Sequence, residues 1–335
     1  FFKQKTAYEI PKRDWSSDVC SSDLISSTTF AYAADNAAYP ARPLRLIVPN
    51  APGGNADIMS RLVAQRLSER IGQSIIVDNR PGANSIIGTE LAAKAAPDGY
   101  TLLTVAQPHT TNPTVVKRLP YDLERDFTAV SLIGSTPLVL VVSPSLHAKN
   151  LNELIALAKA KPGALNFGTT GIANTGHLAG ALLASLAKIE LTLVSYRGTA
   201  NALTDLIAGN VHIGFPAMTS VAAFLKSGKL RALGVTSLKR SRLAPELPTI
   251  SEAGVSGYEA TIWNGLMIPA RTPAAIVTKL NSEAVASLNA AEMRERFAAI
   301  GADVTPGSAA EMQVFLKTQT AMWAKVIRES GIRAE

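Results

Sequence analysis

Residues 44–57 read Leu-Arg-Leu-Ile-Val-Pro-Asn-Ala-Pro-Gly-Gly-Asn-Ala-Asp, and this stretch decides the fold class. The apolar run 44–48 predicts a strand, and residues 57–71, apolar on one side and stopped by Gly72, predict the helix that follows. The paired glycines between them let the backbone approach a ligand with its N–H groups turned outward, and the helix adds its positive N-terminal dipole. The stretch therefore predicts a βα unit whose connecting loop can hold an anion.

The alternation of short apolar runs with amphipathic segments continues along the chain and is typical of βαβ units with a mainly parallel sheet. The first part predicts strands over 74–78 and 100–106, a turn at 79–82, a helix over 86–96 and two strands within 127–142. The pattern then restarts, with helices over 151–161, 175–188, 199–208 and 221–226 and strands over 165–168, 191–196, 211–215 and 230–235. Helices over 273–288, 291–300 and 309–329 close the chain. We expect two α/β lobes in series, with the closing helices packed back on the first lobe.

A second loop resembles the first in its position. Residues 168–177 read Gly-Thr-Thr-Gly-Ile-Ala-Asn-Thr-Gly-His, again between a strand and a helix, and they are rich in small hydroxyl donors. If the lobes face each other, both loops point into one cleft, and their recurrence favours an anion site. The alternative for either loop is an ordinary tight βα turn. Asp57 and His177 have a structural alternative too, since each lies where a side chain caps a helix start.

Composition and charge restrict the class of protein. The 335 residues are 47% hydrophobic and 18% charged, enough for two domains with proper cores, and no apolar run reaches the roughly 18 residues of a spanning helix. The formal charge is +7, and the densest basic stretch, residues 226–242, has no aromatic side chain for stacking on bases. We therefore expect no nucleic-acid partner. This stretch is interpreted as a solvated face, with docking onto a membrane transporter as the alternative.

Familiar enzyme motifs are missing from the sequence. Gly171 and Gly176 have the spacing of a P-loop, but His177 and Leu178 follow in place of Lys and Ser or Thr. Neither a G-x-G-x-x-G nor a G-x-S-x-G motif occurs, and the four histidines are far apart without carboxylates at ligand spacing. We expect no catalytic residue, no metal and no cofactor.

The first residues differ from the rest of the chain. Residues 1–24 show neither helical nor strand periodicity, begin without Met and closely resemble translated sequencing-adaptor read-through; a native disordered extension is the alternative. The tripeptide Ala31-Tyr32-Ala33 is of the kind that signal peptidase cuts. We expect residues 1–33 to be a non-native leader plus a signal-peptide remnant, which includes the lone Cys20. The mature chain would begin near Ala34 and lie in the periplasm.

Motifs through the remaining sequence carry a family resemblance. They are Pro-Gly-Gly-x-x-Asp at 52–57, Asn-Arg-Pro-Gly-Ala at 79–83, Ala-Pro-Asp-Gly-Tyr-Thr-Leu at 96–102, the loop 168–178, Tyr-Arg-Gly at 196–198, Asp-Leu-Ile-Ala-Gly at 205–209, Trp-Asn-Gly-Leu at 263–266 and Trp-Ala-Lys-Val-Ile at 323–327. With them the chain resembles the substrate-binding proteins of tripartite tricarboxylate transporters, the Bug-type periplasmic receptors. The resemblance implies a two-lobed α/β periplasmic-binding-protein fold, type II-like, with a cleft between mainly parallel sheets flanked by helices. The lobes would be 39–137 with 263–335, and 138–262.

The resemblance also implies a function and a ligand shell. The protein would be a monomeric receptor that closes on a small organic acid (a di- or tricarboxylate, an aromatic acid or an amino acid) and delivers it to membrane transporter subunits. Carried to matching positions, the shell comprises Gly53, Gly54, Asp57, Thr169, Thr170, Gly171, Thr175 and His177. Asn84 and Ser85 stand where many members have glycines, so their side chains are predicted to tune the ligand, and Gln107, Phe215 and Ala217 are predicted to complete the pocket. The alternatives are a sensory subunit that presents its solute to a membrane signalling partner, and an enzyme on a similar scaffold.

Overall fold

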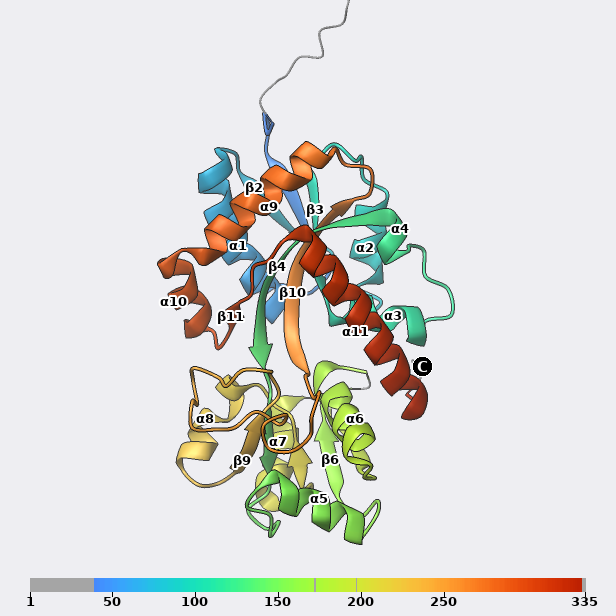
Figure 1. Cartoon of the computed structure of the whole chain (residues 1–335), viewed down its shortest axis with the longest axis vertical. Coiled ribbons are helices and arrows are strands. Elements are labelled where there is room, and N and C mark those ends of the chain that lie inside the picture. Colours follow the sequence, from blue (N-terminus) through green and yellow to red (C-terminus); the bar gives the residue numbers. More distant parts are fainter. Residues whose placement is uncertain (1–38, 172, 197, 333–335) are drawn as a thin grey trace, which may run out of the picture. The chain divides into compact units, whose positions relative to one another are not determined.

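The computed structural model describes residues 39–171, 173–196 and 198–332. The expected leader, its Ala-Tyr-Ala tripeptide and Cys20 lie outside the described residues. Within the compact unit from Ala38 to Glu335, the strands form two sheets, which Figure 1 shows as an upper and a lower α/β lobe. In the described part of the chain, no helix combines the length and the apolar character that crossing a membrane requires.

The first sheet has the strand order β11-β4-β10-β3-β1-β2. Its strands are β1 (Leu44–Val48), β2 (Ile75–Asn79), β3 (Thr101–Ala106), β4 (Phe127–Pro137), β10 (Thr261–Pro269) and β11 (Asp303–Val304). β1 pairs in parallel with β2 and β3, whereas β10 lies antiparallel between β3 and β4, and β11 is antiparallel to β4. The strands β1, β2, β3 and β4 run in one direction, as the predicted mainly parallel sheet requires, and β10 and β11 are reversed strands that the sequence did not predict.

The second sheet has the order β7-β6-β8-β5-β9. Its strands are β5 (Val139–Val142), β6 (Asn166–Thr169), β7 (Thr192–Ser195), β8 (Ile213–Gly214) and β9 (Arg231–Val235). β6 pairs in parallel with β7 and β8, and β5 runs antiparallel to β8 and β9. The predicted strands are confirmed with ends that differ by one or two residues. β5 is the reversed strand of this sheet.

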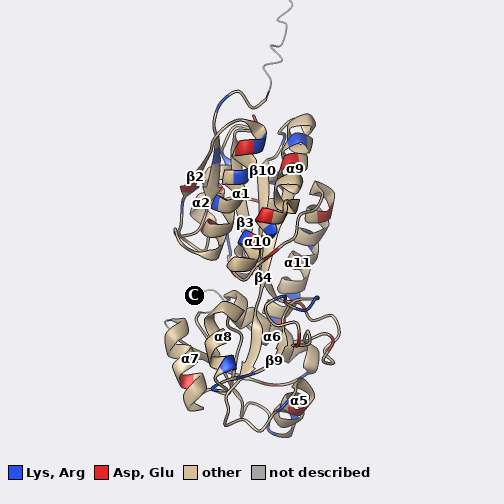
Figure 2. Cartoon of the chain, turned by 90° about the vertical axis from the view of Figure 1, so that its left-hand side faces the viewer, with Lys and Arg blue, Asp and Glu red and all other residues tan. Residues whose placement is uncertain are grey.

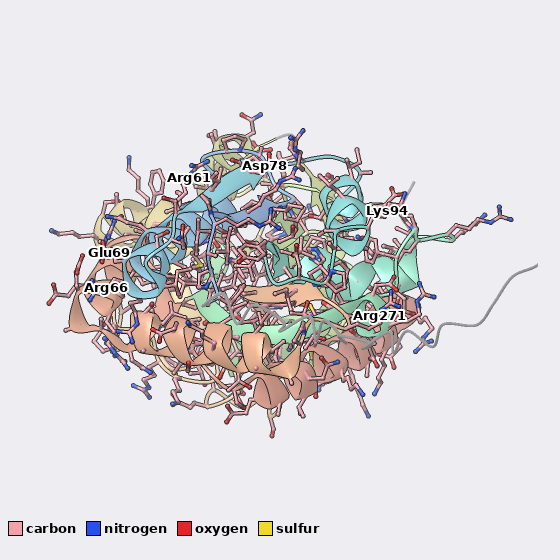
Figure 3. The ribbon with its side chains drawn as sticks, turned by 90° about the horizontal axis from the view of Figure 1, so that it is seen from above. Arg61, Arg66, Glu69, Asp78, Lys94 and Arg271 are labelled. Carbon is pink, nitrogen blue, oxygen red and sulfur yellow. The ribbon has the colours of Figure 1, made fainter. Side chains whose placement is uncertain are left out.

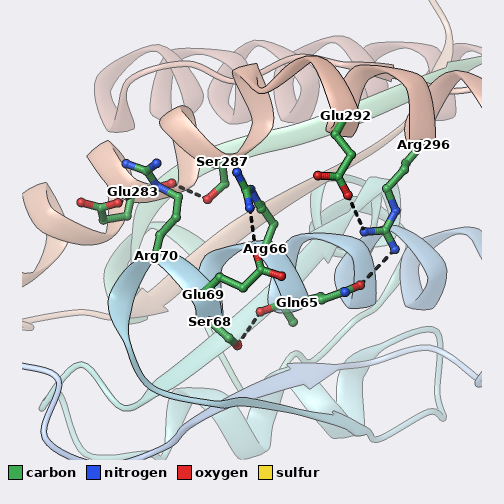
Figure 4. A network of polar contacts seen from close by, with 10 residues as sticks. Gln65, Arg66, Ser68, Glu69, Arg70, Glu283, Ser287, Glu292 and Arg296 are labelled. Atoms are coloured by element: carbon green, nitrogen blue, oxygen red, sulfur yellow. Dashed lines mark hydrogen bonds and ion pairs between the residues drawn. The ribbon is translucent and has the colours of Figure 1, made fainter.

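Helices cover both faces of the first sheet. One face carries α1 (Asn55–Ile71), α9 (Ala274–Asn289) and α10 (Ala291–Ala299), and the other carries α2 (Ile86–Ala93), α4 (Leu123–Asp126) and the start of α11 (Ala309–Glu329). α3 (Gln107–Val115) follows β3 directly. Met59, Leu280 and Phe297 are fully buried where α1, α9 and α10 meet. Along the outer edge of this contact, Arg70 pairs with Glu283 at 2.7 Å and Arg296 donates to Gln65 at 3.0 Å (Figure 4).

The second sheet is covered in the same way. α5 (Leu151–Ala160) and α6 (Thr175–Ala187) pack on one face, and α7 (Thr199–Ala208) and α8 (Met218–Lys226) pack on the other. Leu154 and Leu178 are fully buried in the first of these layers, and Leu206 and Val221 in the second. Asn150 caps α5 by accepting the Glu153 N–H at 2.9 Å.

α11 packs on both lobes, which corrects the expectation that the closing helices return to the first lobe alone. Met312 and Leu316 lie in the core of the first lobe, and Trp323 and Ile327 lie in the core of the second. A capping box formed by Ser308 and Glu311 fixes the start of the helix. Figure 1 shows α11 running alongside both sheets, so the final helix ties the two lobes together.

The chain passes between the sheets at two neighbouring places. Leu138 alone separates β4 from β5, and the segment after β9 returns to β10 through Thr236 and Ala260. The Leu138 N–H donates to the Thr236 hydroxyl at 2.8 Å, the Thr236 N–H donates to the Leu138 carbonyl at 2.9 Å, and the Ala260 N–H donates to the Thr236 carbonyl at 3.0 Å. Hydrogen bonds therefore connect the two crossings to each other.

Candidate ligand-binding site

A cleft of about 580 Å³ lies where the two glycine-rich loops meet. Its lining comes from both lobes: residues 50–56, Asn84 and residues 106–108 and 262–264 from the first sheet's connections, and residues 173–175 from the second's. The helices α1, α3 and α6 begin at Asn55, Gln107 and Thr175, which all lie in this lining. Three positive helix ends therefore converge on one cleft, an arrangement that favours an anion.

The first loop is held by a carboxylate behind it. Gly53 has φ +80°, a conformation that favours glycine, and its N–H donates to Oδ2 of Asp57 at 2.9 Å. Asp57 also accepts from Arg61 at 3.0 Å and from the Asn79 amide at 2.9 Å. Burial alone would raise the pKa of Asp57, but the hydrogen bonds from Arg61, Gly53 and Asn79 hold that pKa below its ordinary value.

This arrangement resolves how an acid can stand beside an anion site. The Asp57 side chain is 4% exposed and does not line the cleft. Its charge is paired with Arg61, which is labelled in Figure 3. Because the Asp57 carboxylate is paired with Arg61 and does not line the cleft, it positions the loop without facing a ligand carboxylate directly.

The segment that follows the Pro-Gly turn is strained. Ala83, Asn84 and Ser85 all have positive φ, at +46°, +51° and +73°, which non-glycine residues rarely adopt. Two hydrogen bonds with Asn112 hold the segment: the Asn84 amide donates to Asn112 Oδ1 at 2.7 Å, and the Asn112 amide donates to the Asn84 carbonyl at 2.9 Å. Asn84 lines the cleft, whereas Ser85 is buried at the start of α2.

The second loop is braced by its own side chains. Oδ1 of Asn174 accepts from the Thr169 hydroxyl at 3.0 Å and the His177 N–H at 2.8 Å, and its amide donates to the Thr170 hydroxyl at 3.0 Å. The N–H of Ala173, at φ +58°, donates to Nδ1 of His177 at 3.0 Å. This bond needs an unprotonated Nδ1, and burial lowers the pKa of His177.

The predicted site residues fall into three groups. Gly53, Gly54, Asn84, Gln107 and Thr175 line the cleft. Thr169, Thr170, Phe215 and Ala217, together with Thr175, line a neighbouring cavity inside the second lobe. Asp57, Ser85, Gly171 and His177 line neither space, and His177 instead borders a hollow beside the end of α11.

Asn50, Trp263 and Asn264 are among the cleft residues that the sequence did not predict to bind the ligand. Within the described residues, five buried side-chain N or O atoms have no hydrogen-bond partner in the protein, and four belong to cleft residues: Asn50 Oδ1, Gln107 Nε2, Trp263 Nε1 and Asn264 Oδ1. An unpaired buried polar atom costs about 1–3 kcal/mol, so its retention indicates a function. The Trp-Asn-Gly-Leu motif at 263–266 was the available signal, but the sequence did not place it in a strand beside the loops.

Three arginines of the basic stretch 226–242 are engaged in contacts within the protein, away from the cleft. Arg240 pairs with Glu252 at 2.8 Å, Arg242 lies 3.7 Å from Asp303, and Arg231 donates to the Ala148 carbonyl at 2.9 Å. Figure 2 shows acidic and basic residues interspersed on the face that it presents. In residues 39–171, 173–196 and 198–332, no three His, Cys, Asp or Glu side chains are grouped so that they could hold a metal ion.

Two α/β lobes, joined by paired crossings around a cleft of helix starts and glycine-rich loops, define the fold of a two-lobed solute-binding protein. The sequence model of the tripartite tricarboxylate transporter family receptor matches residues 59–332. The chain belongs to this receptor family.

Individual relatives agree with this placement. Protein BugT of Bordetella pertussis is 36% identical over 297 residues, covering 88% of this chain and 91% of BugT. The R. palustris protein Rpa4515, solved with adipate, is 37% identical with a TM-score of 0.72, over 88% of this chain and 99% of its own. MatC from Rhodopseudomonas palustris, solved with bound malate, is 29% identical with a TM-score of 0.68, over 86% of this chain and 100% of its own.

Proposed function

We propose that the protein is an extracytoplasmic receptor that binds a small organic carboxylate in the cleft and delivers it to the membrane subunits of a tripartite transporter. One observation carries the proposal: α1, α3 and α6 direct their N-termini into a cleft that also holds four unpartnered buried polar atoms. Delivery rests on the receptor family. The bound adipate and malate of two solved relatives support a carboxylate as ligand.

Within this proposal the predicted residues have different roles. Gly53, Gly54, Asn84, Gln107 and Thr175 would contact the solute or the water around it. The Nε2 of Gln107 and the Nε1 of Trp263 are donors that suit carboxylate or water oxygens, and Asn50 and Asn264 supply acceptors. Asp57 and His177 would act as positioning residues, because their hydrogen bonds hold Gly53 and Ala173 in place from behind.

The lobes would close around the solute. The lobe boundaries predicted from the sequence, 137/138 and 262/263, lie close to the hinge, which we place at the hydrogen-bonded residues Leu138, Thr236 and Ala260. Binding of a ligand that contacts both lobes favours the closed form in proportion to its differential affinity for that form. The role of a binding protein, rather than of an enzyme, rests on the family and on solved relatives that are receptors.

Calorimetric titration tests the proposal. The purified chain, unfolded and refolded once to remove any solute carried through purification, is titrated with citrate, succinate, adipate, benzoate and glutamate. Succinamide and benzamide serve as matched ligands that keep the shape and lose the charge. We expect at least one carboxylate to bind with a dissociation constant below about 10 µM, and its amide to bind at least about 100-fold more weakly. Equal binding of acid and amide, or no binding of any acid, would contradict the proposal.

A further inference from the structure

A second cavity lies beside the cleft, inside the second lobe. It has a volume of about 280 Å³ and lies among the starts of α6, α7 and α8 and the ends of β6 and β8. We call it the inner chamber. Asn174, Thr175 and Ile262 line both the cleft and the inner chamber, so the two spaces adjoin at the start of α6.

The deep wall of the inner chamber is apolar. Leu203 and Leu206 of α7, Ile213 of β8 and Phe215 after it form this wall, and all four are buried. Phe215 is held edge-on against Phe167, with the ring centroids 5.7 Å apart, so its position is fixed by packing. Hydroxyl groups of Thr169, Thr170, Thr199 and Ser220 complete the lining, and none of the described lining residues is charged.

The volume indicates the size of an occupant. An apolar cavity of about 150 Å³ holds a benzene molecule, so 280 Å³ accommodates a six-membered ring with a small substituent or a chain of about six carbons. Burying such a group is favourable by roughly 25 cal/mol per Å² of apolar surface, whereas an unpaired charge in the same place is costly. The apolar wall formed by Leu203, Leu206, Ile213 and Phe215 therefore suits an uncharged, apolar part of a ligand, whereas the helix starts and hydroxyl groups in the same lining suit its polar end.

The four unpartnered polar atoms described above belong to residues of the cleft and not of the inner chamber. Gln107, with its unpartnered Nε2, lies in the cleft and is bonded to Thr175, which lines both spaces. We infer that the solute is a monocarboxylate with an apolar body: the carboxylate lies in the cleft at the starts of α1, α3 and α6, and a ring or a chain of about six carbons fills the inner chamber. This inference rests on the proposed function and narrows its substrate class.

Hexanoate and adipate are the matched probes, because they share a six-carbon chain and differ in one terminal carboxylate. Calorimetric titration of the full chain compares these two acids with benzoate and succinate at one pH and salt concentration. We expect hexanoate or benzoate to bind at least about 10-fold more tightly than adipate, and succinate to bind weakly because it leaves the inner chamber unfilled.

Substitution of Ala202 tests the placement of the apolar body. Ala202 of α7 lines the inner chamber, so Ala202→Phe should fill it and weaken benzoate and hexanoate binding at least 10-fold. Ala200→Phe is the control, since Ala200 is exposed on the same helix and lines neither space. Ala202→Leu serves as a milder variant if the Phe variant unfolds, and thermal unfolding of each variant is measured in parallel.

The outcomes separate this inference from the proposed function. If hexanoate or benzoate binds more tightly than adipate, and this preference is lost in A202F and kept in A200F, both the inference and the proposed function are supported. If adipate or succinate binds at least as tightly as hexanoate, or if A202F binds as the wild type does, the apolar-body inference is wrong. The proposed function as a carboxylate receptor is not contradicted by either result. If no acid in either series binds, both the inference and the proposed function are wrong.

Discussion

The hydroxyl of Thr175, the first residue of α6, donates a 2.5 Å hydrogen bond to Oε1 of Gln107, the first residue of α3. The two residues are 68 positions apart in sequence and belong to connections of different sheets, so this bond joins the lobes across the cleft. It uses one polar atom of the Gln107 amide and leaves Nε2 unpartnered beside the proposed ligand. The Gln107 side chain therefore joins the two lobes and also offers a free N–H donor to the cleft.

Thr175→Val removes this interlobe bond while keeping the side-chain shape. A neutral hydrogen bond contributes about 0.5–1.5 kcal/mol, so we expect carboxylate binding about 2- to 10-fold weaker, measured by calorimetric titration. Thr204→Val is the control, because the Thr204 hydroxyl donates to Ala200 within α7, far from this bond. Equal affinities of the Thr175 variant and the wild type would show that the bond does not contribute to the bound state.

Gly53→Val tests the first loop. The positive φ of Gly53 should destabilise the valine variant by about 1–2 kcal/mol, although no atom lies within 4 Å of the added Cβ. Gly228, between α8 and β9, has φ +69° and equally open surroundings, so Gly228→Val applies the same strain outside the cleft. We expect similar losses of stability by urea denaturation, and at least a 10-fold loss of ligand affinity in G53V alone. An equal effect of both substitutions on affinity would contradict the loop assignment.

Asp57→Asn tests the positioning carboxylate. Since the pKa of Asp57 is lowered in the folded protein, its stabilising contribution is present above the unfolded-state pKa of about 3.9 and is lost as the pH falls through the folded-state pKa. At pH 7 we expect Asp57→Asn to reduce the free energy of unfolding by about 1–3 kcal/mol and to weaken ligand binding. The loss should shrink as the pH falls through the folded-state pKa of Asp57, because the wild-type carboxylate then becomes protonated.

The matched control for Asp57 is an exposed ion pair. Glu292 lies 3.6 Å from Arg296 on α10 and is 62% exposed, so Glu292→Gln should change the free energy of unfolding by less than about 0.5 kcal/mol. Ligand affinity of this variant should equal that of the wild type. A pH-independent difference between Asp57→Asn and the wild type would show that the Asp57 charge does not hold the loop.

His177→Leu tests the brace of the second loop. Burial lowers the pKa of His177, and it lowers that of His109 to about 4, while both have a pKa of about 6.5 in the unfolded chain. The unfolded chain therefore binds more protons, and stability falls as the pH drops below about 6.5. We expect His177→Leu to flatten the decrease of melting temperature between pH 7 and pH 5 and to weaken ligand binding, because Ala173 loses its acceptor. His147→Ala, at an exposed position, should leave affinity unchanged.

Local sequence patterns predicted most of the secondary structure. The helix over 199–208 and the strand over 44–48 match the observed elements at both ends, because apolar spacing and glycine stops act over a few neighbouring residues. α3 escaped prediction because its nine residues include two prolines and three threonines. Its start and middle are held by contacts from elsewhere, including the Asn84–Asn112 pair. β10 escaped prediction because its nearly continuous burial shows no strand alternation.

By itself, the sequence determined the two α/β repeats, the two glycine-rich loops and the helix starts behind them, because these features depend on backbone freedom and periodicity close along the chain. Only the tertiary structure decided which side chains face the cleft. The insertion of β10 between β3 and β4 brings Trp263 and Asn264 beside the first loop, and the hydrogen bond from Asn79 holds the Asp57 side chain behind that loop. Strand order and burial depend on packing between distant segments, which no local pattern encodes.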